Sequence, residues 1–533
     1  MRLTHRTLLA TAALTFCLAA HAGPKVWITL GDAALEQLQK HTAVQVTGSV
    51  AAAASVPPEG RVGAQAMKPE NVHLVQVDED VLAHLSEAVH HELKRCGGYM
   101  FHATEAEGRA TLHRQSRLRT SSGTMATAMA TRPSYTLDNQ TTVNSLIGQV
   151  QASNIGQTIV DLSNYTNRYY TTSHGVAASD WLRQRWATLA NGRTDITVEQ
   201  FTHANWRQKS VIATIRGTDN ASEVVVLGGH LDSIVQGGMS ENTRAPGADD
   251  DASGIASLTE VLRVLAASGY KPRRTLKFMA YAAEEVGLRG SQEIARDHAT
   301  RGVNVVGVMQ LDMTNYKGST NDIYVFTDYT DSAQNSFVTN LVTTYQPGLR
   351  VSTSRCGYAC SDHASWNAQG FAASFPFEAA FSDSNPYIHT PNDTYANMGS
   401  NAQHALKFAK LALSYMVELG SDGPPVGDKT ETFSGSLAQG QNRSFGPFKV
   451  AGGSSFKAST TGTGDIDLYV KRGSVPTTSS YDCRSIGSTA TETCTVNVST
   501  NGDVYVMLRG YTAGNYNLTV TYRPQAALSA AAR

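Results

Sequence analysis

The sequence lacks an excess of charge of either sign. Its 533 residues include 44 lysines and arginines and 45 aspartates and glutamates, which leaves a formal net charge of -1. Charged residues make up only 17% of the chain. Domains that bind nucleic acid or an anionic membrane surface use a pronounced positive charge. We therefore expect neither nucleic acid nor a membrane among the partners of this protein.

Long apolar runs are also missing after the first 22 residues. No later stretch approaches the ~20 consecutive apolar residues that a membrane-spanning helix requires. The first 22 residues are typical of a secretory signal, because Arg2 and Arg6 precede a short apolar core. This core ends at Ala20-His21-Ala22, which matches a small-residue cleavage site. We expect a soluble mature protein that is secreted and extracellular.

The chain has only six cysteines. Cys17 lies in the predicted signal, and Cys96 lies in a segment that we interpret below as a propeptide. The remaining four fall into two local pairs, Cys356 with Cys360 and Cys483 with Cys494. In an exported protein these pairs predict two disulfides. A zinc knuckle is the alternative for the first pair, although no second thiol or histidine pair lies nearby at knuckle spacing.

Changes in composition divide the chain into segments. A Ser/Thr/Ala/Met-rich run at 120–131 is typical of an exposed linker that proteases cut. We predict a propeptide with one helix at 80–94, removed by cleavage between residues 115 and 135; a separate binding domain is the alternative. The predicted segments are a signal peptide (1–22), the propeptide (23–132), an α/β domain (133–420), a linker (421–428), a β-sandwich (429–523) and a tail (524–533).

Residues 133–420 alternate between helical and strand patterns. Their strands are apolar throughout, which is expected of a mixed, mostly parallel sheet covered by helices on both faces. By contrast, residues 429–523 are rich in Thr, Ser and Gly and contain short alternating runs, which predict an all-β sandwich. In the first region we predict helices at 141–163, 176–190, 252–267, 331–345 and 402–419, and strands at 210–216, 222–228, 276–282, 305–311 and 322–327.

One stretch, 224–257, holds two groups of polar residues at its breaks. An apolar β-branched run ends at Gly228-Gly229 and is followed directly by His230 and Asp232. After a loop, the run Asp249-Asp250-Asp251 precedes a helix, because apolar residues recur at 255, 258, 262 and 265. Aspartates at this place cap the free amides of a helix. Metal ligation is the alternative role for the same residues.

Three further groups also lie where a predicted strand ends or on a loop. Glu284 and Glu285 follow one strand, Asp312 follows the next, and His389 lies on a later loop. Because the carboxyl ends of parallel strands share one edge of a sheet, these side chains are expected to converge. Each of them alone is better explained as a solvated or hydrogen-bonded residue. Together, two histidines and several carboxylates predict a site for a divalent metal.

Several motifs in this order resemble a known family, the M28 co-catalytic zinc aminopeptidases, and in particular secreted bacterial leucyl aminopeptidases of the Vibrio type. The resemblance covers about residues 134–420. A weaker resemblance, through DIDLYV at 465–470, links residues 429–523 to the pre-peptidase C-terminal domain of secreted bacterial peptidases. The motifs of the first resemblance are HLD at 230–232, GADDDASG at 247–254, AYAAEEVGLRGS at 280–291, QLDMTNY at 310–316, CGYACSDHASW at 356–366 and IHT at 388–390.

The resemblance implies a role for each of these residues. His230 and Asp312 would bind one zinc, Glu285 and His389 the other, and Asp250 would bridge both. Glu284 would be the general base, and Asp232 would orient the His230 imidazole. Imidazoles and carboxylates suit Zn²⁺, and two such ions ~3.5–4 Å apart can share a hydroxide and polarise a carbonyl.

The resemblance also implies a substrate cleft beside the Cys356–Cys360 turn. Tyr358 in this turn would hydrogen-bond the tetrahedral intermediate; a surface tyrosine is the alternative. An apolar pocket for the N-terminal residue of the substrate would contain Met313, Phe375, Phe377, Phe381 and Ile388, and ordinary core packing is the alternative for the phenylalanines. The sequence departs from well-known members at Phe375 and Ser384, where a methionine and a tyrosine are usual.

The sequence thus predicts a secreted metallo-aminopeptidase with two zinc ions in its catalytic domain. We expect a monomer that acts on peptides or proteins with free N-termini and favours large apolar N-terminal residues such as leucine. The alternatives are a carboxypeptidase or a glutaminyl cyclase of the same fold, the cyclase with one zinc, and a non-catalytic secreted binding protein. Asp465 and Asp467 could bind Ca²⁺ in the C-terminal domain, although aspartates before a strand are more often turn residues.

Overall fold

The computed structural model describes residues 23–51, 71–93, 97–120, 133, 135–190, 192–218, 220–421, 428–450, 454–498 and 502–524. The chain divides into two compact units, Met1–Asp422 and Gly423–Arg533. Several predicted features lie outside the described residues. They are the signal peptide, most of both linkers, nearly all of the tail, Cys17 and Cys96. Within the described parts, no helix combines the length and hydropathy of a membrane span.

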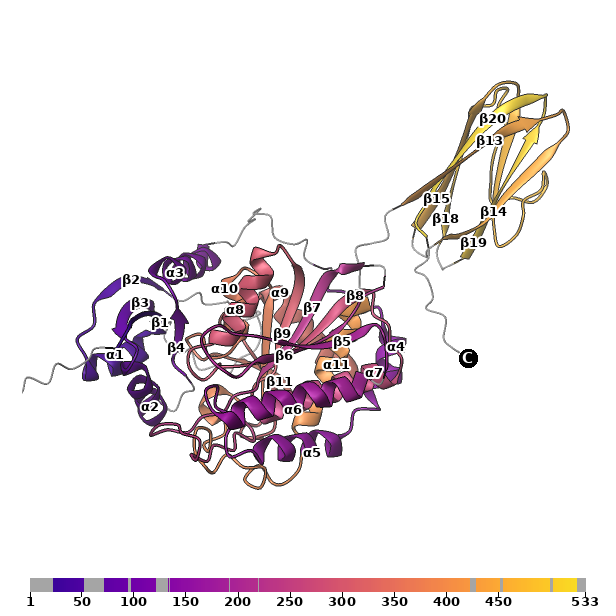
Figure 1. Ribbon diagram of the computed structural model, residues 1–533. Coiled ribbons are helices and arrows are strands. Elements are labelled where there is room, and N and C mark those ends of the chain that lie inside the picture. Colours follow the sequence, from indigo (N-terminus) through magenta and orange to yellow (C-terminus); the bar gives the residue numbers. More distant parts are fainter. Residues whose placement is uncertain are drawn as a thin grey trace, which may run out of the picture. The chain divides into compact units, whose positions relative to one another are not determined.

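The first unit begins with a small domain, residues 23–120, which we call the N-terminal domain (Figure 1). It contains an antiparallel sheet of order β2-β3-β1-β4 and three helices. Ile28, Leu38 and Val89 are fully buried in its core. Its elements are β1 (Lys25–Gly31), α1 (Asp32–His41), β2 (Val46–Ala51), β3 (Asn71–Asp78), α2 (Val81–Leu93), β4 (Tyr99–His102) and α3 (Glu105–Thr120). Of these, only α2 was expected from the sequence.

The rest of the first unit is built on an eight-stranded sheet of order β11-β10-β12-β9-β7-β8-β6-β5. Strand β7 pairs in parallel with β8 and β9, β9 with β12, and β10 with β11; the other neighbours are antiparallel. The predicted mixed sheet is therefore confirmed. The strands are β5 (Ile196–Phe201), β6 (Ser210–Ile215), β7 (Asn220–His230), β8 (Arg274–Tyr281), β9 (Asn304–Gln310), β10 (Ile323–Phe326), β11 (Val351–Ser354) and β12 (Ala373–Phe377).

Helices cover both faces of this sheet (Figure 1). On β7, Val225 and Leu227 pack into the larger core cluster, whereas the alternate residues Val224 and Val226 pack into a second one with residues of α8 and α10. The strands are therefore apolar on both faces, as a covered sheet requires. The helices are α4 (Gln140–Ile147), α5 (Ala152–Ser163), α6 (Ser173–Ala190), α7 (Ala252–Ala267), α8 (Arg289–Thr300), α9 (Ser332–Tyr345), α10 (His363–Ala368) and α11 (Ala405–Ser421), with a short 3-10 helix, η1 (Phe381–Asp383).

Most predicted elements of this region are present, but one predicted helix is wrong. The segment 141–163 forms two helices, α4 and α5, rather than one. The helical conformation is interrupted between them. The buried Glu260 carboxylate on α7 accepts the main-chain N–H of Gln151 at 2.8 Å and so fixes the start of α5. Six elements were not predicted at all, β5, α8, β11, α10, β12 and η1.

Helix α7 starts where the sequence placed it and fixes the geometry of the site. The Asp251 carboxylate caps it by accepting the Gly254 N–H at 2.8 Å, and Ile255, Leu258 and Leu262 are fully buried. The end of β7 runs so close to this cap that a Cβ on Gly229 would lie 2.9 Å from the Asp251 carboxylate. Glycine is therefore required for the strand and the helix start to meet.

The second unit is an all-β sandwich, as predicted. Its two four-stranded antiparallel sheets have the orders β13-β20-β15-β18 and β14-β19-β16-β17. Their facing residues, such as Phe456, Leu468 and Leu518, are fully buried. The predicted Cys483–Cys494 disulfide is present. The strands are β13 (Lys429–Leu437), β14 (Asn442–Val450), β15 (Ser454–Gly462), β16 (Ile466–Arg472), β17 (Cys483–Ser485), β18 (Glu492–Val498), β19 (Gly502–Gly510) and β20 (Gly514–Tyr522).

Candidate metal centre

Five buried residues of the metal-binding type converge at one edge of the eight-stranded sheet. They form two groups, each with ligand atoms within 4.8 Å of one another, and Asp250 belongs to both. His230 Nε2 lies 2.8 Å from Asp250 Oδ1 and 3.5 Å from Asp312 Oδ1. On the other side, His389 Nε2 lies 3.2 Å from Asp250 Oδ2 and 2.8 Å from Glu285 Oε2. The structure thus brings together all five residues expected to be ligands.

The polar atoms of this cluster are arranged for a cation. Asp250 Oδ2, Glu285 Oε1, Asp312 Oδ1 and His389 Nε2 are buried and have no hydrogen-bond partner among the described residues. Buried polar atoms are nearly always paired, so four such atoms facing one another need another partner. The three carboxylates also give the cluster negative charge, and nitrogen and oxygen ligands of this kind suit zinc. The residues therefore fit the metal that the resemblance implies.

The acidic groups of the site have opposite pKa shifts. Burial alone would raise the pKa of Asp250, but the hydrogen bond with His230 and the nearby His389 imidazole outweigh burial and lower this pKa. Burial raises the pKa of Glu285 to about 7. Burial also raises the pKa of Glu284 well above its usual range, although the charge of His230 opposes the shift. Asp250 is thus suited to stay ionised, and Glu284 to exchange a proton.

Two aspartates hold the backbone around the ligands. The Asp251 carboxylate accepts the main-chain N–H groups of His230 at 2.9 Å and Met313 at 3.2 Å, in addition to that of Gly254. Asp393 accepts the main-chain N–H of Asp250 at 3.1 Å and that of the preceding residue at 3.0 Å. Asp251 therefore connects the end of β7, the start of α7 and the turn after β9.

Asp232 lies between the two strand ends that carry His230 and Glu284. Its carboxylate accepts the main-chain N–H groups of Glu284 at 3.0 Å and Glu285 at 3.2 Å. The Nδ1 atom of His230 lies 3.1 Å from the main-chain oxygen of Asp232 and 3.5 Å from its Oδ1. Asp232 is therefore close to the imidazole, as expected, but its hydrogen bonds fix the backbone of the two glutamates.

A buried arginine that was not expected from the sequence, Arg168, holds the loop between His230 and Asp250. Its side chain donates hydrogen bonds to the main-chain oxygens of Leu231, Pro246 and Gly247, at 2.8, 2.5 and 2.8 Å. It is only 1% exposed. Arg168 precedes α6 in a segment without a recognisable motif, so no sequence signal could have assigned it to the site.

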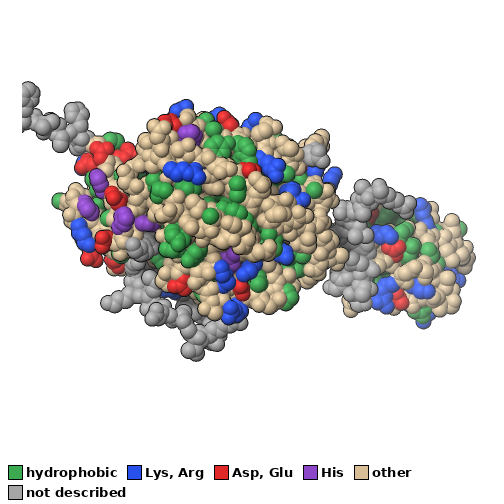
Figure 2. Space-filling model, turned by 90° about the horizontal axis from the view of Figure 1, so that it is seen from below, with side chains coloured by type: hydrophobic (Ala, Val, Ile, Leu, Met, Phe, Trp, Pro, Cys, Tyr) green, Lys and Arg blue, Asp and Glu red, His purple; other side chains and the backbone are tan. Residues whose placement is uncertain are grey.

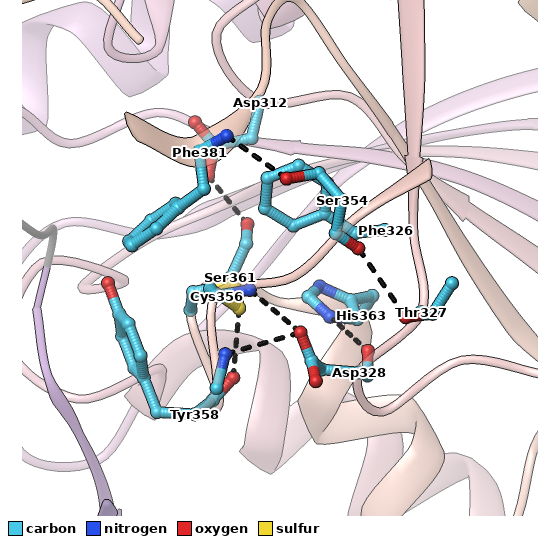
Figure 3. Close-up of a disulfide and its surroundings, with 12 residues drawn as sticks. Asp312, Phe326, Thr327, Asp328, Ser354, Cys356, Tyr358, Ser361, His363 and Phe381 are labelled. Atoms are coloured by element: carbon cyan, nitrogen blue, oxygen red, sulfur yellow. Dashed lines mark hydrogen bonds between the residues drawn. A yellow bond between two sulfur atoms is a disulfide. The ribbon is translucent and has the colours of Figure 1, made fainter. Parts of the chain in front are cut away.

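The Cys356–Cys360 disulfide closes a turn beside the metal-type cluster (Figure 3). The Asp328 carboxylate accepts the N–H of Cys356 at 2.7 Å, and Ser361 just after the turn donates to Asp312 Oδ2 at 2.6 Å. The Tyr358 and Phe381 rings meet edge to face, with centroids 6.1 Å apart; both are drawn in Figure 3. The predicted Cys356–Cys360 disulfide is therefore present. Because these two cysteines are bonded to each other, they do not form a zinc knuckle.

The predicted pocket residues share one apolar cluster with this turn. Met313, Phe375, Phe377 and Ile388 are buried there together with Tyr358, and Phe381 packs against them. Ser384, at a position of departure from the family, donates to the main-chain oxygen of Phe381 at 3.1 Å. The structure thus brings all five predicted pocket residues to one side of the ligands. Tyr358 is 2% exposed, so it is not a surface tyrosine.

Several residues next to the ligands adopt a left-handed backbone. Ala283, Met313 and His389 have φ angles of 57°, 56° and 53°. Non-glycine residues rarely adopt this conformation, and where they do, the surrounding structure holds them. Here the hydrogen bonds of Asp232 and Asp251 fix two of the three positions from the adjacent backbone. The ligand loops are therefore held in shape by their own surroundings.

The N-terminal domain packs against the same region. The His90 ring of α2 stacks on the His389 ring, with centroids 5.1 Å apart and planes 24° apart. Glu79 pairs with Arg289 at 2.8 Å, and Glu107 pairs with Arg296 at 2.6 Å. Figure 2 shows histidine and acidic side chains gathered on the surface of this domain. The domain therefore covers one side of the ligand cluster.

Among the described residues, Asp465 and Asp467 do not form a cluster of the metal-binding type. The main-chain oxygen of Asp465 accepts the N–H groups of Tyr511 and Thr512. Asp467 is buried in β16, and its carboxylate lies 3.5 Å from the Tyr469 hydroxyl. Asp465 lies directly before β16, where the alternative placed it, whereas Asp467 lies within the strand.

Comparison with known proteins places the chain in a family. It matches peptidase family M28 over residues 210–416 and the bacterial pre-peptidase C-terminal domain over residues 447–510. A probable aminopeptidase of Saccharomyces cerevisiae is 33% identical over 296 residues, which cover 54% of this chain and 77% of that protein. The chain belongs to peptidase family M28. The predicted M28 resemblance and the predicted C-terminal domain are thereby confirmed.

Other M28 relatives carry similar names. A leucine aminopeptidase 1 of Fusarium vanettenii is 36% identical over 294 residues, 53% of this chain and 73% of that protein. The crystal structure of the LapA aminopeptidase of Legionella pneumophila covers 75% of this chain and 100% of its own, with 27% identity and a TM-score of 0.58. LapB of the same organism has 29% identity and a TM-score of 0.58, over 74% of this chain and 100% of its own. The prediction of an aminopeptidase, a hydrolase, agrees with these names.

Proposed function

We propose that this M28 peptidase is a secreted aminopeptidase that uses two zinc ions and removes large apolar residues, such as leucine, from peptide N-termini. The observation that carries the proposal is the pair of ligand groups that share Asp250. One group is His230, Asp250 and Asp312, and the other is Asp250, Glu285 and His389. The Asp250 carboxylate belongs to both groups, and each group has two further ligands. Two adjacent metal ions need this arrangement.

In the proposed mechanism these five residues would hold the zinc ions, which supply Lewis acidity toward the scissile carbonyl and a more acidic water. Glu284 takes the proton of the attacking water and returns it to the leaving amine. Burial raises the pKa of Glu284, which makes its carboxylate a better acceptor for that proton. Asp232 holds the main chain of Glu284, and the Tyr358 hydroxyl donates a hydrogen bond to the oxygen of the tetrahedral species.

The apolar cluster around Tyr358 supports the preference for leucine-like residues. Met313, Phe377 and Ile388 are buried in it, and Phe381 is packed at its rim. We assign this cluster to the side chain of the N-terminal residue of the substrate, which gains about 1.5–3 kcal/mol if it is fully buried there. The rings of Phe375 and Phe377 lie 5.3 Å apart, so a smaller residue at Phe375 would enlarge the pocket.

We propose that residues 23–132 are a propeptide that keeps the enzyme latent. Supporting observations are the stacking of His90 on His389 and the low exposure of Glu284 and His389, 7% each with the N-terminal domain in place. Cleavage between residues 115 and 135 would separate the N-terminal domain from the α/β region. N-terminal sequencing of the secreted active form tests this step. A start between residues 115 and 135 supports it, and a start near Gly23 in a fully active enzyme contradicts it.

The test of the proposed function is a substrate panel. The purified protein is assayed on a series of aminoacyl-p-nitroanilides, with and without a chelator, and on peptides blocked at either end. We expect hydrolysis of the leucyl substrate, loss of activity with chelator and recovery with added zinc. Acetylated N-termini should not be cleaved, because an aminopeptidase recognises the free amine. Release of C-terminal residues, or cyclisation of glutaminyl substrates without hydrolysis, would contradict the proposal.

A further inference from the structure

Arg289, the first residue of α8, holds its guanidinium beside the candidate metal ligands. It lines one concavity together with Glu285 and His389. Its main-chain N–H donates to the main-chain oxygen of Ala283 at 3.0 Å, and its Nε donates to that of Val286 at 3.0 Å. Both partners belong to the α/β region, so this region by itself fixes the base of the guanidinium. None of the roles assigned above uses this charge.

Two side chains of the N-terminal domain cover this guanidinium. Arg289 Nη2 donates to Glu79 Oε1 at 2.8 Å, and the centroid of the Phe101 ring lies 4.1 Å from Arg289 Cζ. The Arg289 side chain is only 13% exposed in the intact chain. Among the described residues, Glu79 is the only acidic residue that forms an ion pair with Arg289. Removal of the N-terminal domain would therefore expose a positive charge that has lost this partner.

A main-chain contact lies next to this ion pair. The N–H of Phe101 donates to the main-chain oxygen of Gly287 at 3.2 Å. A Cβ on Gly287 would lie 3.1 Å from the Phe101 nitrogen and 2.8 Å from the Tyr99 ring, so glycine is needed for this close approach. An N–H, an aromatic ring and the Glu79 carboxylate thus meet the short segment 287–289. A peptide that ends in phenylalanine carries the same three groups on its last residue.

We propose that Arg289 binds a carboxylate of the substrate in the active form, and that Glu79 occupies this place in the latent chain. The inference rests on the proposed aminopeptidase function and on the proposed removal of the N-terminal domain. Arginine matches a planar carboxylate with two parallel N–H groups, and its flat face stacks on aromatic rings. The N-terminal leucine of a peptide has no free carboxylate, so the bound group belongs to the part that follows the scissile bond. Arg289 is thus a residue for substrate specificity.

The experiment uses the secreted active form, after N-terminal sequencing has shown where it begins. Leucyl-phenylalanine has a free terminal carboxylate, leucyl-phenylalaninamide has none, and leucyl-glutamic acid amide has one on a side chain. We expect Arg289→Gln to lower kcat/KM about 5-fold on leucyl-phenylalanine, mainly through KM, and less than about 2-fold on its amide. A similar loss on the glutamic acid amide would extend the site to side-chain carboxylates, and no loss there would assign it to the terminal carboxylate. Arg296→Gln, which also pairs with the N-terminal domain through Glu107, is the matched control and should change none of the substrates.

A second measurement needs no variant and decides the same point if Arg289→Gln fails to fold. In the unmodified active form, added salt should lower kcat/KM on leucyl-phenylalanine relative to its amide, because salt screens an exposed charge pair. Equal effects of Arg289→Gln on both phenylalanine substrates, or no effect of salt on their ratio, would overturn the inference. An active form that begins near Gly23, with Glu79 still on Arg289, would overturn it as well. Failure of the unmodified enzyme to cleave leucyl-phenylalaninamide would instead contradict the proposed function.

Discussion

The Asp232 carboxylate and the backbone of Glu284 are joined directly, because Asp232 Oδ1 accepts the Glu284 N–H at 3.0 Å. The other oxygen accepts the N–H of Glu285 at 3.2 Å. One buried side chain thus sets the backbone of two adjacent glutamates, one a candidate ligand and the other the candidate base. Since the two are adjacent in the turn just after β8, their side chains can serve different partners only if this main chain is held.

We therefore expect Asp232→Ala to damage activity without removing any candidate ligand. The variant leaves two buried main-chain N–H groups unpaired and frees the backbone of Glu284 and Glu285. Zinc affinity should fall about 10- to 100-fold, and kcat should fall with it. Asp232→Asn keeps one acceptor oxygen and should lose less. Zinc titration together with kcat measures both effects, and unchanged kcat in Asp232→Ala would show that the two hydrogen bonds do not matter.

Glu284→Gln is expected to separate chemistry from metal binding. The amide cannot accept the proton of the attacking water, so kcat should fall about 10²- to 10⁴-fold. Zinc content should stay the same, because Glu284 is not among the five candidate ligands. Glu293→Gln on α8, where Glu293 pairs with His203 at 2.7 Å, is the matched control. Near-normal turnover of Glu284→Gln would eliminate Glu284 as the base.

Asp393 should act through the position of Asp250. Its carboxylate accepts the main-chain N–H of Asp250 at 3.1 Å, and it is 2% exposed. Asp393→Ala is expected to weaken zinc binding about 10- to 100-fold, although Asp393 itself is not a candidate ligand. Isothermal titration of the metal-free protein with zinc measures the change. Asp383→Ala in η1 is the control and should bind zinc normally; equal affinity of both variants would exclude the positioning role.

The candidate metal ligands could be predicted from their positions along the chain. Each of His230, Glu285 and Asp312 follows a buried apolar strand, and parallel strands bring such ends to one edge. Helix α7 was predicted with both of its bounds, since Asp251 caps it and its apolar residues recur with helical spacing. Local patterns of this kind carry enough information to define both the site and the elements around it.

The supporting residues could not be predicted, because their partners are main-chain atoms of distant loops. Arg168 and Asp393 bond to the loop at 246–250 from about 80 residues before it and 140 residues after it, and no local pattern marks such pairs. Apart from α2, the elements of the N-terminal domain were not predicted, for a different reason. Its strands have only four to eight residues, and β2 contains Gly48 and Ser49, which are typical of turns.

Stability should fall in acid partly through the buried His298. Lys277 Nζ lies 3.0 Å from its Nε2 and the Ile294 oxygen 2.8 Å from its Nδ1, so the ring is neutral with its proton on Nδ1. Burial and the Lys277 charge lower its pKa from 6.5 to about 4. The unfolded chain takes up this proton below pH 6.5 and the folded chain only near pH 4. The contribution of His298 is therefore complete above pH 6.5 and lost as the pH falls toward 4.

The slope of this loss is about 1.4 kcal/mol per pH unit for one histidine. Urea unfolding between pH 7 and 4.5 measures it. We expect His298→Gln to be less stable than the unmodified protein at pH 7 but to lose stability with a slope smaller by about that amount. Identical slopes for the two proteins would show that His298 is protonated in the folded state, contrary to the geometry.

The ion pairs of the N-terminal domain should control latency only modestly. Glu79 and Glu107 are each about a third exposed, and pairs of this exposure contribute at most about 1 kcal/mol. The double variant Glu79→Gln/Glu107→Gln is expected to raise the activity of the intact chain a few-fold, and added salt should raise that of the unmodified chain similarly. Glu105→Gln, which breaks a pair within α3, is the control. Lower activity of the double variant would contradict an inhibitory role.

The central claim is that Asp250 joins two metal-binding groups that work together. The most direct measurement is the zinc content of the purified chain, determined by elemental analysis while metal-free protein is titrated with zinc and assayed on leucyl-p-nitroanilide. We predict two zinc ions per chain at full activity, and weaker binding of one of them in His389→Ala. Full activity with one zinc ion per chain, or a zinc content that His389→Ala leaves unchanged, would contradict the claim.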